Sequence, residues 1–322
     1  MKRQAAFSNE GCFYKGNLHT HSSRVDGALS PEEWVRHYAA RGYHFLAITD
    51  HNLYNRLSYA PETNLTVLPG VEVDTNLQKD FVPDLPKDEG NRAFHNVFLG
   101  RDVPENGYED GKRFDFLADG TQEAFQKHID DAVANHHLAI YCHPQYSCTY
   151  TRYFDRLQGY FAVELYNNVS AMYADMDTDN GNLWDELLGM GRIIYGVAVD
   201  DAHGIPHSFG GWVMVKAESN CAENLLKALE NGAFYASCGP IIRDFYVEDD
   251  VAHVVAENVA EVCFRYDRWP SKRIVVQQDE EVSHISFKLR DFRYIRAVVT
   301  DKQGRKAWTN PIFLKEDMFH RF

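Results

Sequence analysis

The stretch GNLHTHSSRVDG, residues 16–27, decides how the chain is organised. Its apolar approach and turn-rich end are typical of a short buried strand that runs into a loop. Side chains two apart in a strand point to the same side, so we expect His19 and His21 to present both imidazoles to one metal ion. Asp26 follows the turn and is expected to bring an oxygen ligand to the same rim. One His-x-His pair is a weak signal, so the argument depends on what recurs downstream.

Length and composition bound the class of protein. A chain of 322 residues suits one large domain, or one large and one small domain. Its 44% hydrophobic and 13% aromatic content excludes a disordered polymer. The formal net charge of −14 argues against a general nucleic-acid binder, whose affinity comes from Lys and Arg on phosphates. Nucleic acid is therefore not an expected partner.

The sequence also predicts where the protein works. The N-terminus lacks the apolar core of a secretory signal. No run of about 18 apolar residues exists, so we expect no membrane partner. The six cysteines are scattered without Cys-x-x-Cys spacing, which is typical of reduced thiols in a cytoplasmic protein.

Further apolar runs end abruptly in polar residues. A buried parallel strand delivers chemistry in this way at its carboxyl end. Runs of this kind end at His51, at His143, and at Asp201 with His203. We therefore expect these side chains to gather with the first three at one rim.

Two further candidates need a separate argument. Glu72 lies inside an apolar run, and a buried carboxylate is costly unless it is paired or bound to metal. A salt-bridged core glutamate is the alternative. His95 stands at the start of its predicted strand, residues 94–100, rather than at its end. It reaches the same rim only if this strand runs antiparallel to residues 67–73, which is our hypothesis.

The order of predicted elements indicates an α/β fold with a second, smaller module. About seven strands alternate with helices through residue 203, which predicts a barrel-like α/β domain over residues 1–240. One helix begins with a capping box, in which Ser30 is the N-cap and Glu33 follows three residues later. Alternating, turn-rich sequence after 240 predicts a small antiparallel, sandwich-like β module over residues 241–322. Its predicted strands cover residues 244–247, 262–266, 273–276, 285–289 and 294–301.

The order and spacing of these motifs resemble the PHP (polymerase and histidinol phosphatase) superfamily of metal-dependent hydrolases. The motifs that carry the resemblance are HTH at 19–21, ITDH at 48–51, GVEV at 70–73, His95, CHP at 142–144 and DAH at 201–203. The resemblance covers roughly residues 12–240. Residues 24–27 and 308–312 look like a subgroup that carries a C-terminal β module. That subgroup includes phosphoesterases and some enzymes that cleave carbamate esters.

The resemblance implies a distorted (β/α)7 barrel that holds two or three divalent metal ions. Carried over residue by residue, one metal site uses His19, His21, Glu72 and Asp201. The second uses Glu72, His95 and His143, with Glu72 bridging, and the third uses Asp26, His51 and His203. Some relatives have a histidine, shifted by one residue, where Asp26 stands, so the third site departs from the family pattern.

The residue types agree with hydrolytic chemistry. Imidazoles with carboxylates suit Mn²⁺, Zn²⁺ or Fe²⁺. Paired metals lower the pKa of a bridging water toward ~7 and hold the hydroxide for attack. The candidate catalytic residues are Glu72 and Asp201, which are also ligands, together with Arg24 and His207. Arg24 either grips a phosphate in bidentate fashion or forms a surface salt bridge. His207 either protonates a leaving group or is a loop histidine.

Other polar residues follow strand ends as well. Asp50 and Asp200 stand next to ligands, where they either orient imidazoles or cap turns. Further candidates for lining the pocket are Asn52, Tyr54, Arg56, Tyr146 and Asn167.

These observations predict a metal-dependent phosphoesterase acting on a small phosphorylated substrate. The alternatives are a carbamate, ester or amide hydrolase on the same metal centre, and a non-catalytic metal-binding sensor. The complete ligand set argues against the sensor. The C-terminal strands offer a surface for homo-oligomer formation.

Overall fold

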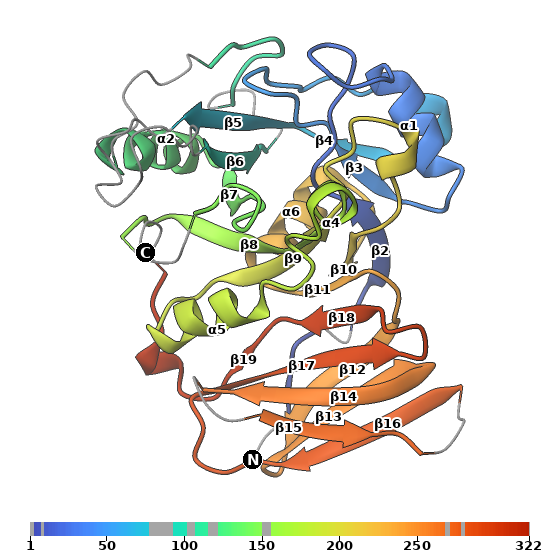
Figure 1. The fold of residues 1–322 in the computed structure, drawn as a ribbon, viewed down its shortest axis with the longest axis vertical. Helices are drawn as coiled ribbons and strands as arrows, with labels where there is room; N and C mark the ends of the chain where they lie inside the picture. Colours follow the sequence, from blue (N-terminus) through green and yellow to red (C-terminus); the bar gives the residue numbers. More distant parts are fainter. Residues whose placement is uncertain are drawn as a thin grey trace.

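Three β-sheets carry the fold of the described residues (Figure 1). The computed structural model describes residues 3–7, 10–76, 93–101, 107–114, 122–149, 156–267, 271–277 and 281–321. The mixed α/β part and the strand-rich C-terminal part lie one above the other in this view.

A five-stranded sheet forms one wall of the α/β part. Its strands, in spatial order, are β5 (Gly70–Asn76), β6 (Ala93–Leu99), β7 (Leu138–Tyr141), β8 (Tyr160–Asn167) and β9 (Tyr195–Val199). Strand β6 runs antiparallel to both of its neighbours, whereas β7, β8 and β9 are parallel. The start of β6 therefore lies at the rim where the other strands end. This confirms the hypothesis about the direction of the strand that carries His95.

A ten-stranded sheet forms the opposite wall and continues into the C-terminal part. Its strands, in spatial order, are β15 (Ser271–Val275), β14 (Val259–Tyr266), β17 (Tyr294–Asp301), β18 (Lys306–Thr309), β11 (Phe234–Ser237), β10 (Trp212–Ala217), β2 (Cys12–Asn17), β3 (Phe45–Ala47) and β4 (Thr66–Leu68), with β19 (Ile312–Phe313) paired to β17. Strands β2, β3 and β4 are parallel. Strands β11 and β18 are hydrogen-bonded to each other from either side of residue 240. The division of the chain at this residue stays a prediction.

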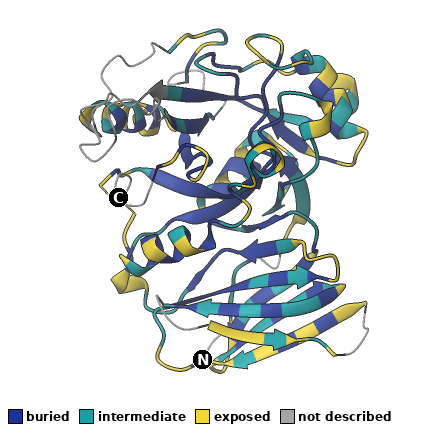
Figure 2. Ribbon diagram, viewed as in Figure 1, coloured by how far each residue is buried: buried dark blue, intermediate teal, exposed yellow. Residues whose placement is uncertain are grey.

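A four-stranded antiparallel sheet completes the C-terminal part. It consists of β1 (Gln4–Ala5), β12 (Ile242–Glu248), β13 (Val251–Glu257) and β16 (Val282–Lys288). The buried side chains of its strands share one apolar core with β14 and β17. Each of the five predicted C-terminal strands is present, and Figure 2 shows burial that changes along strands such as β12, β14 and β16, whereas β15 is mostly exposed and the first half of β17 is fully buried. Strand β13 was not predicted.

Helices are few and cover the sheets from outside. They are α1 (Pro31–Ala39), α2 (Gln122–Ala134), α4 (Asn168–Ala174), α5 (Gly181–Gly189) and α6 (Ala222–Glu230), with short 3-10 helices η1 (Pro61–Thr63), η3 (Ile205–His207) and η4 (Glu316–Met318). The capping box of α1 is confirmed, because Ser30 accepts from the Glu33 amide and Glu33 accepts from the Ser30 amide. Apolar faces pack α1, α2, α5 and α6 against the sheets, as with Trp34 and Val35 of α1, whereas the buried residues of α4 are Asn168 and Ser170.

The described strands do not close into a barrel through hydrogen bonds. Pro69 separates β4 from β5, so the two walls belong to different sheets. At the other side, β9 lies beside β10 and β11 without pairing to either. The mixed α/β class is confirmed, and the seven-unit barrel stays a prediction.

Two further observations concern the cysteines and the lengths of the helices. All six cysteines are free thiols. Among the described residues, no helix has both the length and the apolar character needed to span a bilayer.

A buried histidine far from the predicted ligands gives the fold a pH dependence. His137 donates from Nδ1 to the Asn135 carbonyl at 2.8 Å, and its Nε2 accepts from the Tyr54 hydroxyl at 2.9 Å. Burial lowers the pKa of His137 to about 4. The unfolded chain binds this proton near pH 6.5 and the folded chain does not, so the stability from His137 is present above pH 6.5 and lost as pH falls toward 4.

We therefore expect acidification from pH 7.5 to 5.0 to cost the wild type about 2 kcal/mol more than it costs His137→Gln. Urea unfolding of both proteins at the two pH values, with chelator present, measures this difference. Equal losses in the two proteins would contradict the assignment.

Candidate metal centre

The predicted ligands lie together at the rim where the strands end. Three rim residues adopt a left-handed backbone: Asn52 at φ 54°, His143 at φ 24° and Asp201 at φ 54°. Such conformations cost of order 1–3 kcal/mol each in residues other than glycine and gather at functional sites. Here they turn the chain sharply after a strand, so that side chains following the strand face the rim.

Four side chains converge most tightly: His19, His21, Glu72 and Asp201, all buried. His19 Nε2 lies 3.1 Å from His21 Nε2, 3.2 Å from Glu72 Oε2 and 3.4 Å from Asp201 Oδ1. His21 Nε2 lies 3.2 Å from the same Glu72 oxygen and 3.1 Å from the same Asp201 oxygen. Five pairs of potential metal-binding atoms are thus separated by 3.1–3.4 Å.

These separations fit a shared cation. Ligands bound about 2.1 Å from one ion lie roughly 3.0–3.4 Å apart in octahedral or tetrahedral geometry. Glu72 Oε2 and Asp201 Oδ1 are buried and have no hydrogen-bond partner among the described residues. Such orphaned carboxylate oxygens are costly in a protein interior, and a divalent ion would satisfy both.

The other oxygen of Glu72 faces a second set of imidazoles. His95 Nδ1 lies 2.8 Å and His143 Nε2 lies 3.3 Å from Glu72 Oε1. His51 Nδ1 lies 3.1 Å from Glu72 Oε2, so this ring borders both groups. The geometry brings together the residues predicted for the second site and places Glu72 between the two sites.

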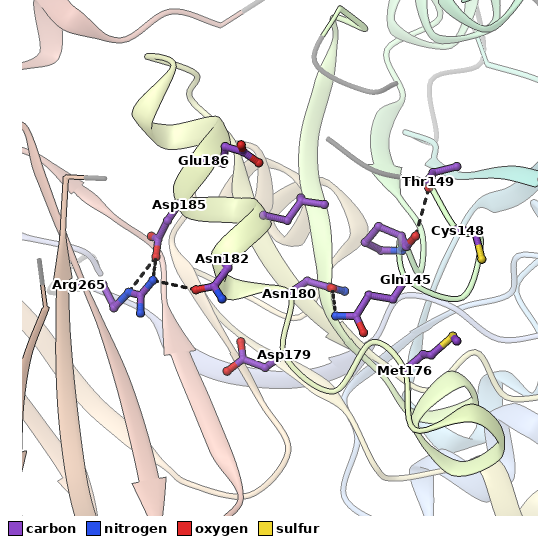
Figure 3. Close-up of a pocket in the computed structure, with 12 residues that line it drawn as sticks. Gln145, Cys148, Thr149, Met176, Asp179, Asn180, Asn182, Asp185, Glu186 and Arg265 are labelled. Atoms are coloured by element: carbon purple, nitrogen blue, oxygen red, sulfur yellow. Dashed lines mark hydrogen bonds and ion pairs between the residues drawn. The ribbon is translucent and has the colours of Figure 1, made fainter. Parts of the chain in front are cut away.

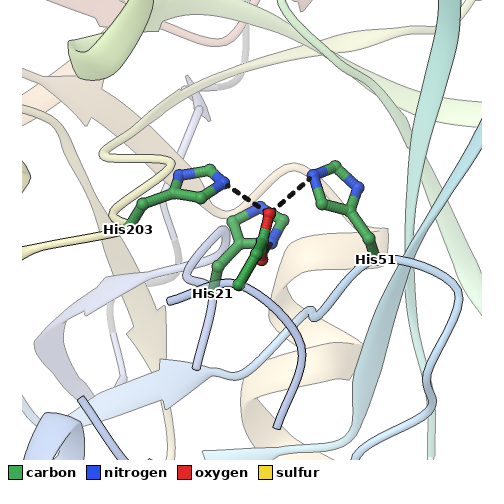
Figure 4. A group of neighbouring side chains, drawn as sticks. His21, His51 and His203 are labelled. Carbon is green, nitrogen blue, oxygen red and sulfur yellow. Dashed lines mark ion pairs between the residues drawn. The ribbon is translucent and has the colours of Figure 1, made fainter. Parts of the chain in front are cut away.

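The third group is looser and more exposed (Figure 4). Asp26 Oδ2 lies 3.5 Å from His203 Nε2 and 3.7 Å from His51 Nε2. His21 Nδ1 lies 3.6 Å from Asp26 Oδ1, and the rings of His21 and His203 stack at 4.0 Å. The ligand atoms of these four residues can hold a further ion.

Charges within the centre favour ionised ligands. Burial alone would raise the pKa of Glu72, but His19, His51 and His95 hold this pKa well below its usual range. Burial lowers and the carboxylates of Asp201 and Glu72 then raise the pKa of His21, to about 9. His21 therefore carries a proton near neutral pH when no metal is bound, so we expect metal binding at this ring to release a proton.

Comparison with known proteins relates part of the chain to one protein family. The model of the PHP domain family matches residues 17–176. Residues 17–176 are a PHP domain. Asp201 and His203 lie beyond the matched range and join the PHP domain through the fold.

Two curated proteins are similar to parts of the chain. The DNA polymerase/3'-5' exonuclease PolX of Bacillus subtilis (strain 168) is 28% identical over 142 residues, which are 40% of this chain and 23% of that protein. The 5'-3' exoribonuclease of Haemophilus influenzae is 38% identical over 66 residues, which are 19% of this chain and 24% of that protein. The chain thus spans about a quarter of the length of the curated relatives that it matches.

Two solved structures illustrate the similarity of the chain to known folds. A "two-domain protein containing predicted PHP-like metal-dependent phosphoesterase" from Bacteroides vulgatus has a TM-score of 0.49 at 11% identity, covering 96% of this chain and 98% of that chain. An amidohydrolase from Chromobacterium violaceum has a TM-score of 0.41 at 18% identity, covering 59% of this chain and 88% of that chain.

A glutamate that the sequence analysis missed orients two of the ligands of the metal centre. Glu164 of β8 accepts from His19 Nδ1 at 2.8 Å and from the His143 backbone amide at 2.8 Å. The first contact leaves the Nε2 lone pair of His19 facing the centre. Glu164 stands inside an apolar strand sequence as Glu72 does, which is the signal that should have marked it.

Two other imidazoles are oriented by their immediate surroundings. His143 Nδ1 lies 2.9 Å from the Ser147 hydroxyl, and His203 Nδ1 lies 2.9 Å from the Asp201 carbonyl. Each contact leaves the Nε2 atom for the centre.

Asp50 and Asp200 shape loops, which agrees with the capping alternative. Asp50 accepts from the Ser22 amide and hydroxyl and from Asn55. Asp200 accepts from the Tyr38 hydroxyl and from the backbone amides of residues 209–211. The two carboxylates thereby hold the loops that carry His21 and His203.

Arg24 lies near the rim but is engaged by a carboxylate. Its two terminal nitrogens each lie 3.0 Å from an oxygen of Asp110, and Nη1 also donates to Asn55 and Tyr59. A phosphate would have to compete with Asp110 for this guanidinium. The role of Arg24 in binding phosphate stays a prediction.

His207 lies next to His203, whose backbone amide donates to His207 Nδ1 at 3.2 Å. Its Nε2 is 2.7 Å from the Tyr173 hydroxyl, and its ring is 6.4 Å from the ring of His203. Burial, and secondarily His203, lower the pKa of His207.

The remaining pocket candidates divide into two groups. Asn167 donates to Asp201 Oδ2 at 3.2 Å, and the Tyr146 ring meets the His143 ring edge-on at 5.8 Å, so both belong to the centre. The side chains of Asn52, Tyr54 and Arg56 instead contact Asp74, His137 and the Tyr108 carbonyl.

A cavity of about 780 Å³ lies between the segment that follows His143 and helix α5 (Figure 3). Pro144 and Gln145, which follow His143, line one end of it, and Asp185 with Arg265 lines the other. None of the nine predicted ligands lines this cavity. The metal centre is thus adjacent to the cavity and outside it.

Proposed function

We propose that the chain is a metal-dependent phosphoesterase that hydrolyses a small phosphorylated substrate. One observation carries the proposal: Glu72 is fully buried and offers its two oxygens to two different sets of imidazoles. A buried carboxylate in this position is suited to bridge two cations. The PHP domain is consistent with this chemistry, because the family includes metal-dependent phosphoesterases.

The residues divide the work by position. His19, His21, Glu72 and Asp201 would hold one divalent ion, and Glu72, His95 and His143 a second. Asp26, His51 and His203 would hold a third. Bound divalent ions supply Lewis-acid stabilisation of the charge that develops on phosphoryl oxygens.

The chain supplies orientation and proton transfer. Glu164 and Ser147 fix which nitrogen of His19 and His143 faces the centre. We assign the protonation of the leaving group to His207. Its Nδ1 accepts from the His203 backbone amide at 3.2 Å, so the proton of the neutral ring is on Nε2, 2.7 Å from the Tyr173 hydroxyl, and the leaving oxygen would take the place of this hydroxyl.

Both ester classes deserve a test. The two curated relatives are named as nucleases, which cleave phosphodiesters. The formal charge of −14 favours a small substrate over a polymeric one.

We predict that protein reconstituted with Mn²⁺ hydrolyses p-nitrophenyl phosphate or bis-p-nitrophenyl phosphate and leaves p-nitrophenyl N-methylcarbamate intact. The shared leaving group allows one absorbance assay to compare the three. Chelator should abolish the activity, and added Mn²⁺ should restore it. Cleavage of the carbamate alone would make the protein a carbamate hydrolase. No turnover with metal bound would contradict the proposed hydrolysis of these esters.

A further inference from the structure

Exposed apolar side chains lie on the three segments that follow the strands β7, β8 and β9. Single exposed apolar residues are ordinary on a protein surface, whereas a group around a polar site is informative. Three segments that follow β7, β8 and β9 contribute the exposed residues Tyr146, Met172, Tyr173 and Ile205. Each of these segments comes directly after a strand that leads into the centre.

Two of these residues are tyrosines close to predicted ligands. Tyr146 contacts a ligand directly, and Tyr173 contacts His207, which lies beside a ligand. Tyr146 is 55% exposed, and its ring lies 5.8 Å from that of His143. Tyr173 is 70% exposed, and its ring lies 5.3 Å from that of His207, which in turn lies 6.4 Å from the ring of His203. Both rings therefore lie close to rings of the centre or of His207, while most of their surface faces solvent.

Hydrogen bonds hold the two aromatic segments to each other. The carboxylate of Asp177 accepts from the backbone amides of Gln145 and Tyr146, both at 2.9 Å. Asp177 follows α4, the helix that carries Tyr173. Asn168, at the start of α4, donates to the His207 carbonyl at 2.8 Å. The tyrosines are exposed in their side chains and fixed in their backbones.

The guanidinium of Arg24, near this rim, is already paired with a carboxylate. Arg24 is held by both oxygens of Asp110, so its charge is balanced within the protein. The part of a substrate that does not react would therefore meet the tyrosine rings rather than the charge of Arg24. A planar ring gains additional stabilisation from edge or face contact with tyrosine that a saturated ring of similar size does not gain.

We propose that Tyr146 and Tyr173 determine specificity by binding an aromatic ring in the leaving group of the substrate. The substrate class is a phosphoester whose alcohol or phenol carries an aromatic ring. An aryl or arylalkyl ester and a nucleotide share this chemistry. This inference rests on the proposed phosphoesterase function.

The test compares 2-phenylethyl phosphate with 2-cyclohexylethyl phosphate. The two leaving alcohols have similar size and similar basicity, so their kcat/KM ratio isolates aromaticity. We expect wild-type protein to prefer the aromatic ester by about 3- to 10-fold. The ratio should fall to about 1 in the Tyr146→Leu/Tyr173→Leu double variant and persist in Tyr146→Phe and Tyr173→Phe, which retain the rings. In a third arm, a nucleoside monophosphate should lose at least threefold more in kcat/KM than methyl phosphate loses in the double variant if nucleotides are the source of the ring.

The failures of the two proposals can be told apart. A wild-type ratio near 1, or a ratio unchanged in the double variant, would overturn the aromatic assignment while phosphoesterase activity stands. No hydrolysis by metal-loaded wild type of either ester, of methyl phosphate or of bis-p-nitrophenyl phosphate would overturn both.

Discussion

Replacing Glu72 by glutamine is expected to lower kcat/KM for a phosphoester by about 1,000-fold or more, which is ~4 kcal/mol of transition-state stabilisation. Glutamine has nearly the same shape, so the buried site remains filled. It lacks the charge, however, and presents an amide nitrogen where a second carboxylate oxygen faces the imidazoles. Metal content should fall with activity, because both predicted sites share this residue.

Parallel measurements of metal content and initial rate check this expectation. Glu248→Gln is the matched control, since Glu248 is an exposed glutamate of β12 far along the chain from every predicted ligand. It should retain full metal content and activity. Wild-type turnover in Glu72→Gln with normal metal content would contradict the assignment of Glu72 as the bridge.

Replacing Asp185 by alanine is expected to cost about 3–5 kcal/mol of unfolding free energy. Asp185 of α5 accepts from Arg296 at 2.7 and 2.8 Å and from Arg265 Nε at 2.8 Å. Arg296 is only 1% exposed and lies over the Trp184 ring at 4.5 Å. Without Asp185, a buried guanidinium would lose the carboxylate that balances it. The contact also joins α5 to β14 and β17, so its loss weakens the attachment of the C-terminal strands.

Guanidinium unfolding of Asp185→Ala beside Asp291→Ala measures the difference. Asp291 pairs with Lys315 at 2.6 Å, but the Asp291 side chain is 88% exposed. An exposed pair of this kind contributes at most about 1 kcal/mol. A loss below about 1 kcal/mol in Asp185→Ala would show that the buried network does not hold the two parts together.

Local signals in the sequence predicted the parts of the structure that depend on near neighbours. The capping box of α1 spans four residues and was readable as such. The ligands follow a repeated pattern in which an apolar run ends in a polar residue. The reversed direction of β6 was also inferable, because His95 stands at the start of its strand while the other candidates stand at strand ends.

Long-range partners were beyond the reach of pattern and spacing. Glu164 contacts His19 across 145 residues, and Arg24 meets Asp110 across 86. Neither pairing leaves a periodic trace, since it arises only when distant loops are brought to one rim. The ladder between β11 and β18 likewise joins strands that the sequence assigns to different modules. Strand β13 has buried positions filled by Ala252, Val254 and Ala256, which form a weaker apolar pattern than its neighbours.

The most direct test of the account is a metal titration of phosphoesterase activity. Chelator-treated protein would receive increasing Mn²⁺ while bound metal and phosphate release are measured in the same samples. The account predicts no activity without metal and full activity only after about two ions are bound per chain. Full activity in the metal-free protein, or metal bound without any phosphate release, would contradict it.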